Sequence, residues 1–391
     1  MNCDTNTFKF IRQHQTDDPL ELLLHAQRYK DVDIRYAAQQ IEGIQQALDK
    51  WPTLARYEAV VYPPKINREQ SSSEATAQYK ATQFVIPGQK VADLTGGMGI
   101  DTMAFASIGA SIDYCEQNAE LASIAQSNFA ALGLVNIHVH TVDSIRWLEQ
   151  NETRYDIIYI DPARRDINGK KVAAFEECTP NLLEHLAMIK ERCSTLIVKS
   201  SPMIDIATAK KELGRPVETH IIGIKNECKE VLFVLGGNAS DRIVCTDLSD
   251  GLPPFIFTEA DEQAANCRYA RQTETYLCEP NATIMKGGGY KYLGQAHNLA
   301  KLGRNTHLYF SENKPEGFPG RVFLVEQEIA LTAQAVQKAI PQKEAHIVSR
   351  NYPVKAPDLM RQLKMKEGGS KYIVATTLSD KKIGLLCSRI K

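Results

Sequence analysis

The sequence predicts an α/β protein: a mostly parallel sheet of seven strands, with a helical segment before it and α+β segments after it. Between residues 66 and 240, short apolar strands alternate with helices, which is typical of a parallel sheet covered on both faces. The last two strands of this region are separated only by a short polar turn, which predicts an antiparallel hairpin. Helical spacing of apolar residues before residue 65, and mixed strands and helices after residue 241, predict the flanking parts.

We therefore divide the chain into four parts, at residues 1–65, 66–240, 241–320 and 321–391. The first part is a predicted helical domain that ends at Pro63-Pro64, and a capping box from Ser71 to Glu74 opens the next helix. The seven strands are expected at residues 90–94, 111–115, 137–141, 156–160, 195–199, 218–224 and 230–235.

The region after residue 241 divides into a weakly patterned part and a clear one. The weak part has strand-like residues at 242–246 and 255–258 and a Gly-rich stretch at 286–289. The clear part predicts a strand, a helix over 357–366 that stops at Gly368-Gly369, and two more strands. This order predicts a compact α+β module at the end of the chain.

The composition, 43% hydrophobic and 24% charged, is that of an ordinary globular protein. No apolar run approaches the length of a membrane span and the start lacks a signal-peptide pattern, so we expect a cytoplasmic protein without a membrane partner. The nine cysteines form no CxxC pair, and we expect neither a metal site nor a disulfide framework. The oligomeric state does not follow from the sequence.

A Gly-rich loop follows the first predicted strand, in the sequence Asp93-Leu94-Thr95-Gly96-Gly97-Met98-Gly99. Glycines at such a turn let a cofactor approach the backbone, although a tight turn without a ligand would have the same pattern. A dinucleotide fingerprint needs a small residue three positions after Gly99, where this chain has Thr102. The Asp93 carboxylate would repel a pyrophosphate and suits the cationic methionine end of S-adenosylmethionine (SAM).

Acidic residues follow the next two strands. Glu116 ends the second strand, 17 residues after Gly99, where it can accept both hydroxyls of a ribose. Asp143 and Ser144 follow the third strand, where they would meet the adenine amino group. Either acid alone would more often be a solvated loop residue, but their order at successive strand ends predicts one cofactor site.

The fourth strand ends in Asp161-Pro162-Ala163-Arg164 at the same expected edge of the sheet. Methyl transfer from a sulfonium mainly requires the nucleophile to be aligned with the methyl group. Asp161 would orient a nucleophilic nitrogen, Pro162 would supply a backbone acceptor, and Arg164 would grip a base or a phosphate. The alternative is a helix that begins with Asp at its N-cap and Pro at its first position.

Together, this loop, Glu116, Asp143 and the Asp161 tetrad resemble class I SAM-dependent methyltransferases over residues 70–236. The resemblance implies a Rossmann-like methyltransferase sheet of seven strands, with SAM as the cofactor and Asp161, Pro162 and Arg164 at the catalytic site. The implied cofactor-binding residues are Asp93, Thr95, Gly96, Gly97, Gly99, Glu116, Asp143 and Ser144.

The last third of the chain is similar to bacterial methyltransferases with a ferredoxin-like insert and a C-terminal THUMP-like domain. The similarity lies in three motifs, Glu279-Pro280-Asn281, Arg350-Asn351-Tyr352-Pro353 and Glu367-Gly368-Gly369-Ser370-Lys371-Tyr372. THUMP domains bind RNA, so this similarity implies an RNA substrate. The catalytic part is most similar to the trimethylguanosine-synthase-related branch, which methylates an exocyclic guanine nitrogen.

The chain departs from these families at a few positions. Thr95 stands where many methyltransferases have Gly, and Ala163-Arg164 replaces the Pro-Tyr or Pro-Phe of amine methyltransferases, whose aromatic ring stacks on a flipped base. An Arg plane can also stack on a base. Asp-Pro-x-Arg is also found in RNA uridine C5 methyltransferases, but those need a Cys after the fifth strand, where this chain has Ser200-Ser201-Pro202. Methylation of a nitrogen is therefore favoured over methylation of carbon.

Charge is unevenly distributed along the chain. Residues 341–391 carry 11 Lys and Arg against 4 Asp and Glu, a net charge of +7, although the whole chain has a net charge of -1. Such a basic segment suggests contact with RNA phosphates, or else a solvated face. The predicted RNA-binding residues are Arg350, Lys355, Arg361, Lys364, Lys366 and Lys371.

The sequence thus favours a SAM-dependent methyltransferase that acts on a base nitrogen of RNA. Two other functions stay open at this point. One is methylation of a small molecule or a protein, and the other is RNA binding without catalysis.

Overall fold

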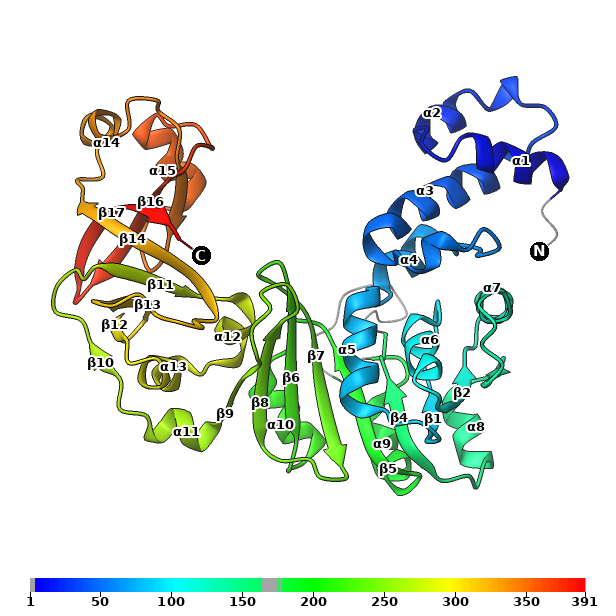
Figure 1. Ribbon diagram of the computed structural model, residues 1–391. Coiled ribbons are helices and arrows are strands. Elements are labelled where there is room, and N and C mark those ends of the chain that lie inside the picture. Colours follow the sequence, from blue (N-terminus) through cyan, green and yellow to red (C-terminus); the bar gives the residue numbers. More distant parts are fainter. Residues whose placement is uncertain (1–3, 164–174, 176–177, 391) are drawn as a thin grey trace. The chain divides into compact units, whose positions relative to one another are not determined.

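The computed structural model describes residues 4–163, 175 and 178–390 (Figure 1). The chain forms two compact units. Unit 1 comprises Met1–Pro216 and Phe233–Ala239, and unit 2 comprises Val217–Leu232 and Ser240–Lys391. None of the described helices is both long and apolar enough to cross a membrane.

Unit 1 begins with the expected helices. They are α1 (Thr5–Gln13), α2 (Pro19–Leu24), α3 (Ile34–Lys50) and α4 (Lys65–Gln70), with 3-10 turns at Ala26–Arg28 and Leu54–Arg56. Aspartates fix the starts of α1, α2 and α3, because the Asp4, Asp18 and Asp33 side chains accept hydrogen bonds from backbone N–H groups of the first turn. The first helices share a small core of their own, in which Phe10, Leu22 and Ile41 are buried.

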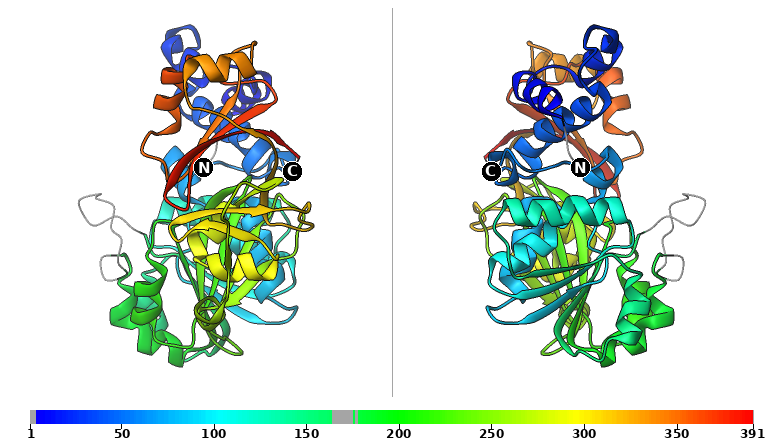
Figure 2. Two further views of the ribbon diagram at one scale, coloured as in Figure 1. Left: turned by 90° about the vertical axis from the view of Figure 1, so that its left-hand side faces the viewer. Right: turned by 90° about the vertical axis from the view of Figure 1, so that its right-hand side faces the viewer.

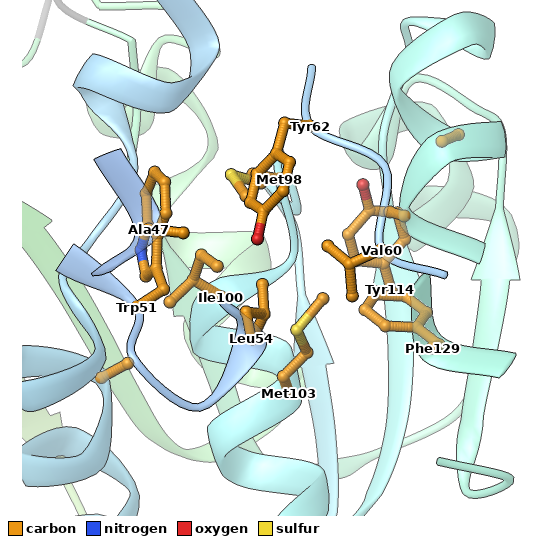
Figure 3. Close-up of a cluster of buried hydrophobic side chains, with 13 residues drawn as sticks. Ala47, Trp51, Leu54, Val60, Tyr62, Met98, Ile100, Met103, Tyr114 and Phe129 are labelled. Carbon is orange, nitrogen blue, oxygen red and sulfur yellow. The ribbon is translucent and has the colours of Figure 1, made fainter. Parts of the chain in front are cut away.

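The end of α3 and the segment that follows it pack on the Gly-rich loop (Figure 3). Trp51 and Tyr62 lie in one buried cluster with Met98 and Ile100 of the loop region. The Trp51 indole N–H also donates to Ser72 O at 2.8 Å. The helical segment and the parallel sheet of unit 1 therefore share a hydrophobic core.

The centre of unit 1 is a parallel sheet in the order β3-β2-β1-β4-β5. Its strands are β1 (Lys90–Asp93), β2 (Ser111–Cys115), β3 (Ile137–His140), β4 (Tyr155–Ile160) and β5 (Cys193–Ser200). The apolar residues of β4 and β5 are buried on both faces of the sheet, as a parallel sheet covered by helices requires.

Helices cover both faces of this sheet, and in the right-hand view of Figure 2 its strands lie between two groups of helices. One group includes α5 packed on α6, and in the other α9 contacts α8 and α10. The six helices are α5 (Glu74–Phe84), α6 (Ile100–Ser107), α7 (Ala119–Ala131), α8 (Ser144–Gln150), α9 (Leu182–Glu191) and α10 (Ile206–Leu213).

The predicted hairpin is confirmed in β6 (Glu218–Ile224) and β7 (Glu227–Gly236), which are neighbours in the sheet. Its turn consists of Lys225 and Asn226, whose φ angles of 53° and 61° match the turn that joins antiparallel strands in two residues. The start of β7 belongs to unit 2, and its end, from Phe233, belongs to unit 1. In unit 2, β8 (Arg242–Asp247) pairs in parallel with β6, and β9 (Phe255–Thr258) pairs antiparallel with β8. Both segments are strand-like in the sequence, and they come in addition to the seven strands predicted for the methyltransferase sheet.

The rest of unit 2 is built on one eight-stranded sheet, in the order β10-β12-β13-β11-β14-β17-β16-β15. Its strands are β10 (Arg268–Tyr269), β11 (Tyr276–Pro280), β12 (Ala300–Gly303), β13 (Thr306–Ser311), β14 (Gly320–Glu328), β15 (His346–Ser349), β16 (Lys371–Leu378) and β17 (Lys381–Arg389). Its helices are α11 (Glu259–Ala264), α12 (Ala282–Gly287), α13 (Tyr290–Ala296), α14 (Ala333–Ala339) and α15 (Ala356–Leu363). The Gly-rich stretch joins α12 to α13. A Cβ at Gly289 would lie 2.8 Å from the Phe257 ring, so close packing explains that glycine.

The predicted fold class is confirmed: a mixed α/β protein with N-terminal helices and a C-terminal α+β sheet. Two local predictions were wrong. The N-cap of α5 is Ser73, not Ser71: the Ser73 side chain accepts from Thr76 N, and the Glu74 carboxylate accepts from Thr53 rather than closing a capping box. The helix expected to reach residue 366 ends at Leu363, since Lys364 takes a left-handed conformation with φ of 54°. The division at residues 65, 240 and 320 stays a prediction.

Candidate cofactor and acceptor site

The Gly-rich loop connects β1 to α6 and is held from both sides. Gly96 packs its backbone on the Tyr114 ring, and a Cβ there would lie 2.0 Å from that ring. Gly99 has φ of 81° and faces Phe129 in the same way. Gly97 is different: a Cβ there would meet nothing nearer than Thr95 O at 3.7 Å. Packing thus explains Gly96 and Gly99, whereas Gly97 borders open space.

Glu116 directly follows β2 and is half-buried beside this loop. Its Oε2 accepts a hydrogen bond from Gly97 N at 3.0 Å, and its Oε1 accepts one from Asn118 N at 2.8 Å. Two backbone donors therefore fix the carboxylate at the strand end. Each oxygen keeps a further lone pair for a ligand hydroxyl.

Asp93 is fully buried at the end of β1, and both of its oxygens serve the loop itself. Oδ1 accepts from Thr95 N at 3.1 Å, and Oδ2 accepts from the Thr102 hydroxyl at 2.6 Å. Burial raises the pKa of Asp93 to about 7, despite the lowering effect of these hydrogen bonds. The nearby carboxylates of Asp101 and Asp161 add to the rise. The structure thus gives Asp93 a supporting position behind the loop.

Thr95 links the loop to the end of β4. Its hydroxyl accepts a hydrogen bond from Asp161 N at 2.6 Å. A glycine at this position would lack that hydroxyl, which gives a physical reason for the departure noted in the sequence. Hydrogen bonds thus connect Asp93, Thr95 and Asp161, and a separate one connects Gly97 to Glu116, so the loop contacts the ends of three neighbouring strands.

Asp143 and Ser144 lie at the end of β3 and start of α8. The Asp143 side chain is the N-cap of α8, because its Oδ1 accepts from Ile145 N at 3.0 Å and Arg146 N at 3.1 Å. Backbone hydrogen bonds from Glu116 N to His140 O and from Val142 N to Glu116 O place this turn beside Glu116. Ser144 is buried.

Asp161 is the half-buried residue that directly follows β4, with 31% of its side chain exposed. Pro162 is buried, and Ala163 exchanges backbone hydrogen bonds with Thr179. Arg164 lies outside the described residues. The Lys199 ammonium group, at the end of β5, donates to Asp161 Oδ2.

Lys199 and the residues behind it are the part of this site that sequence reasoning missed. Lys80 of α5 is fully buried and forms an ion pair with Asp101 Oδ1 at 3.0 Å. Asp101 Oδ2 accepts from the hydroxyls of Ser72 and Tyr159, each at 2.8 Å. Burial acts to raise the pKa of Asp101, but the Lys80 and Lys199 ammonium groups outweigh it and the pKa is lowered. The available signal was Lys199 itself, a charged residue that directly follows the apolar run Leu196-Ile197-Val198.

The six predicted RNA-binding residues all lie in unit 2, and three of them are ion-paired. Arg350 binds Glu279, Arg361 binds Asp358, and Lys371 binds Glu326. Within the described part of the chain, the other three have no ion pair, and all are exposed: Lys355, Lys364 and Lys366. An open hollow of about 610 Å³ beside α15 is lined by Pro353, Val354, Lys355, Asp358, Arg361 and Gln362.

The fold is that of a Rossmann-like methyltransferase domain, and comparison with known proteins makes the class specific. Residues 65–174 match the family described as "Putative SAM-dependent methyltransferase". Residues 276–319 match a ferredoxin-like domain, and residues 320–389 match a THUMP domain-like family. The crystal structure of a "putative methyltransferase" from Porphyromonas gingivalis W83 is 31% identical over 98% of each chain, with a TM-score of 0.85. This chain belongs to that family of SAM-dependent methyltransferases with ferredoxin-like and THUMP-like domains.

A curated relative is more distant. An uncharacterized RNA methyltransferase from Mycoplasma mobile is 24% identical over 157 residues, which are 39% of this chain. The match spans 43% of that relative's length.

Proposed function

We propose that this protein transfers a methyl group from SAM to a nitrogen of an RNA base. The observation that carries the proposal is the half-exposed Asp161 carboxylate, hydrogen-bonded through its backbone to the loop that borders open space at Gly97. A cofactor site and an acceptor site thus meet at the ends of β1, β2 and β4. This is the sheet edge where open α/β folds bind their ligands.

The residues present fit SAM. Gly97 leaves open space beside the loop, and two N–H groups orient the Glu116 carboxylate so that it can accept the ribose hydroxyls. Asp143 and Ser144 would meet the adenine, and Asp93 would hold the loop in place. When bound, SAM supplies an electrophilic methyl group on a sulfonium.

Asp161 would position the acceptor. Lys199 binds Oδ2, and among the described residues no hydrogen bond uses Oδ1, so Oδ1 can accept from an N–H of the acceptor. The nitrogen then points its lone pair at the methyl group, and the carboxylate can hold the proton that the nitrogen loses. Pro162 and Arg164 keep their proposed roles, as the backbone acceptor and the group that grips a base or phosphate.

RNA is the proposed substrate for three reasons. Residues 320–389 match a THUMP-like family, the curated relative is named an RNA methyltransferase, and residues 341–391 are strongly basic. The exposed lysines of this segment would neutralise phosphates. An exocyclic guanine nitrogen is the proposed target, on the similarity of the catalytic part to the trimethylguanosine-synthase-related branch.

The test has two parts, SAM binding by calorimetry and transfer of tritiated methyl groups to total RNA from a strain that lacks the protein. Glu116→Ala should weaken SAM binding at least tenfold, because two charge-assisted hydrogen bonds of roughly 1.5–3 kcal/mol each are lost. Glu120→Ala is the matched control, an exposed acid in the first turn of α7, and should bind SAM normally.

The outcomes separate the competing functions. SAM binding without transfer to RNA would favour a small-molecule or protein substrate. Absence of SAM binding would favour an RNA-binding protein without catalysis. Unchanged affinity in Glu116→Ala would mean that the cofactor site lies elsewhere.

A further inference from the structure

The ends of β4 and β5 place two opposite charges side by side. The strands pair in parallel with Ile160 opposite Val198, so the next residues of each strand, Asp161 and Lys199, are neighbours at the carboxyl edge. The Lys199 ammonium group donates to Asp161 Oδ2, and 10% of the lysine side chain is exposed, against 31% for the aspartate. The lysine therefore lies deeper than the aspartate that it contacts.

Behind this pair lies a second one, formed by Lys80 and Asp101. Lys199 also acts on Asp101, since its charge is one of the causes that lower the pKa of Asp101. The order Asp161, Lys199, Asp101, Lys80 alternates in sign from the half-exposed carboxylate to the fully buried Lys80. Burying charges is costly unless each one is compensated. Removing one charge of this arrangement would leave its partner buried without an opposite charge, which destabilises the fold.

We propose that Lys199 is the positioning residue of the acceptor site, which fixes Asp161 and cancels its charge so that the site takes a neutral nucleobase nitrogen rather than an aliphatic ammonium group. An isolated, half-buried carboxylate would attract a cation such as a protonated amine. Paired with Lys199, the carboxylate keeps one oxygen for an N–H donor but presents no net charge. A neutral amino group of a base satisfies that oxygen without bringing an uncompensated charge into the site.

The charged groups that face Asp161 come from several elements. Lys199 lies on β5, Asp93 at the end of β1, and Asp101 on α6, with Lys80 of α5 behind Asp101. Among the described residues, both lysines are thus matched by aspartates. The inference rests on the proposed function, because it assigns the acceptor to the site beside Asp161.

The experiment compares Lys199→Met, Lys199→Arg, Asp161→Asn and the double variant Asp161→Asn/Lys199→Met with the wild type. The measurements are kcat and KM for total RNA from the deletion strain, SAM affinity by calorimetry, and urea unfolding. Lys199→Met should lower kcat at least tenfold with SAM affinity within threefold of wild type, whereas Lys199→Arg, which keeps the cation, should recover most of the rate.

The double variant should be no slower than Asp161→Asn alone, because both changes disable the same group. The control is Lys90→Met, a half-exposed lysine at the start of β1 that lies 3.9 Å from Asp113, and it should behave as wild type.

Substrate charge provides a second measurement. The wild type should methylate RNA and leave poly-L-lysine unmodified. In Lys199→Met, the rate on RNA relative to the rate on poly-L-lysine should be lower than in the wild type. A wild type that methylates poly-L-lysine better than RNA would overturn the inference. So would a normal kcat in Lys199→Met, rate losses that add in the double variant, or a loss of SAM affinity that parallels the loss of rate.

The variants also separate this inference from the proposed function. If Asp161→Asn turns over at the wild-type rate, the acceptor site is elsewhere and the proposed function fails. If Asp161→Asn is inactive but Lys199→Met is normal, only the role of Lys199 fails. Should Lys199→Met fail to fold, the charge-free double variant and Lys199→Arg still decide the question.

Discussion

Replacing Gly96 with Ala tests whether the loop is held in place by its contact with Tyr114. The added Cβ would lie 2.0, 2.4 and 2.5 Å from three atoms of the Tyr114 ring. Carbon atoms in contact are about 3.5–4.0 Å apart, so the ring or the loop must move by about 1.5 Å. The ring cannot move freely: it is fully buried, it packs edge-on against Phe129 at 5.4 Å, and its hydroxyl donates to Gly97 O at 2.6 Å.

We therefore expect Gly96→Ala to lower the free energy of unfolding by about 1–3 kcal/mol, the usual cost of overpacking a core. SAM affinity should fall at least tenfold, because the displaced loop carries Gly97 away from Glu116. Urea unfolding and calorimetry measure the two effects. Gly88→Ala is the control, since Gly88 has φ of 84° but nothing within 4 Å of a Cβ. It should lose about 1–2 kcal/mol from backbone strain and bind SAM normally. A Gly96→Ala protein with the stability and SAM affinity of the wild type would refute the reasoning.

Two further predictions concern charge. The raised pKa of Asp93 means that the folded protein holds a proton up to about pH 7 that the unfolded chain releases near pH 3.8, so the free energy of unfolding should fall as pH rises across that range. Asp93→Asn should remove this part of the fall, and equal pH dependence of urea unfolding in both proteins would contradict it. In RNA binding, each neutralised phosphate of a single strand contributes about 0.7 to the slope of log affinity against log salt. Replacing the three exposed lysines without an ion pair among the described residues, Lys355, Lys364 and Lys366, should therefore lower the slope by about 2. Replacing the three ion-paired residues, Arg350, Arg361 and Lys371, should change the slope less, and equal changes in the two triple variants would contradict the prediction.

The strands and the Gly-rich loop could be predicted from sequence because each depends on local patterns. A buried strand such as β4 is an apolar run, which is not the pattern of a surface element. The turn after β1 needs small residues, whichever side chains pack on it. Glu116 and Asp161 could be placed at one edge because parallel strands end on the same side. The hydrogen bond from Asp161 N to Thr95 could not be predicted, since it depends on the side-chain contact of one threonine.

The buried charges behind the acceptor site could not be predicted either. Lys80 and Asp101 are 21 positions apart on different helices, and each would ordinarily be assigned to a solvated helix face. Only the packing of α5 against α6 brings them together. The end of α15 at Leu363 shows a similar limit, because Lys364 adopts a conformation that glycine usually supplies.

The contact of Trp51 and Tyr62 with the loop limits where members of this family can be truncated or joined to one another. The match to the methyltransferase family begins at residue 65, yet the apolar cluster around Met98 and Ile100 is completed by residues that precede it. A chain shortened to the matched range would keep every cofactor motif and still expose these two side chains to water. Chimeras between relatives would meet the same constraint, because helices exchanged at residue 65 would have to match the foreign loop at positions 98 and 100. A segment exchanged between relatives must therefore include residues that precede residue 65, where the match to the methyltransferase family begins.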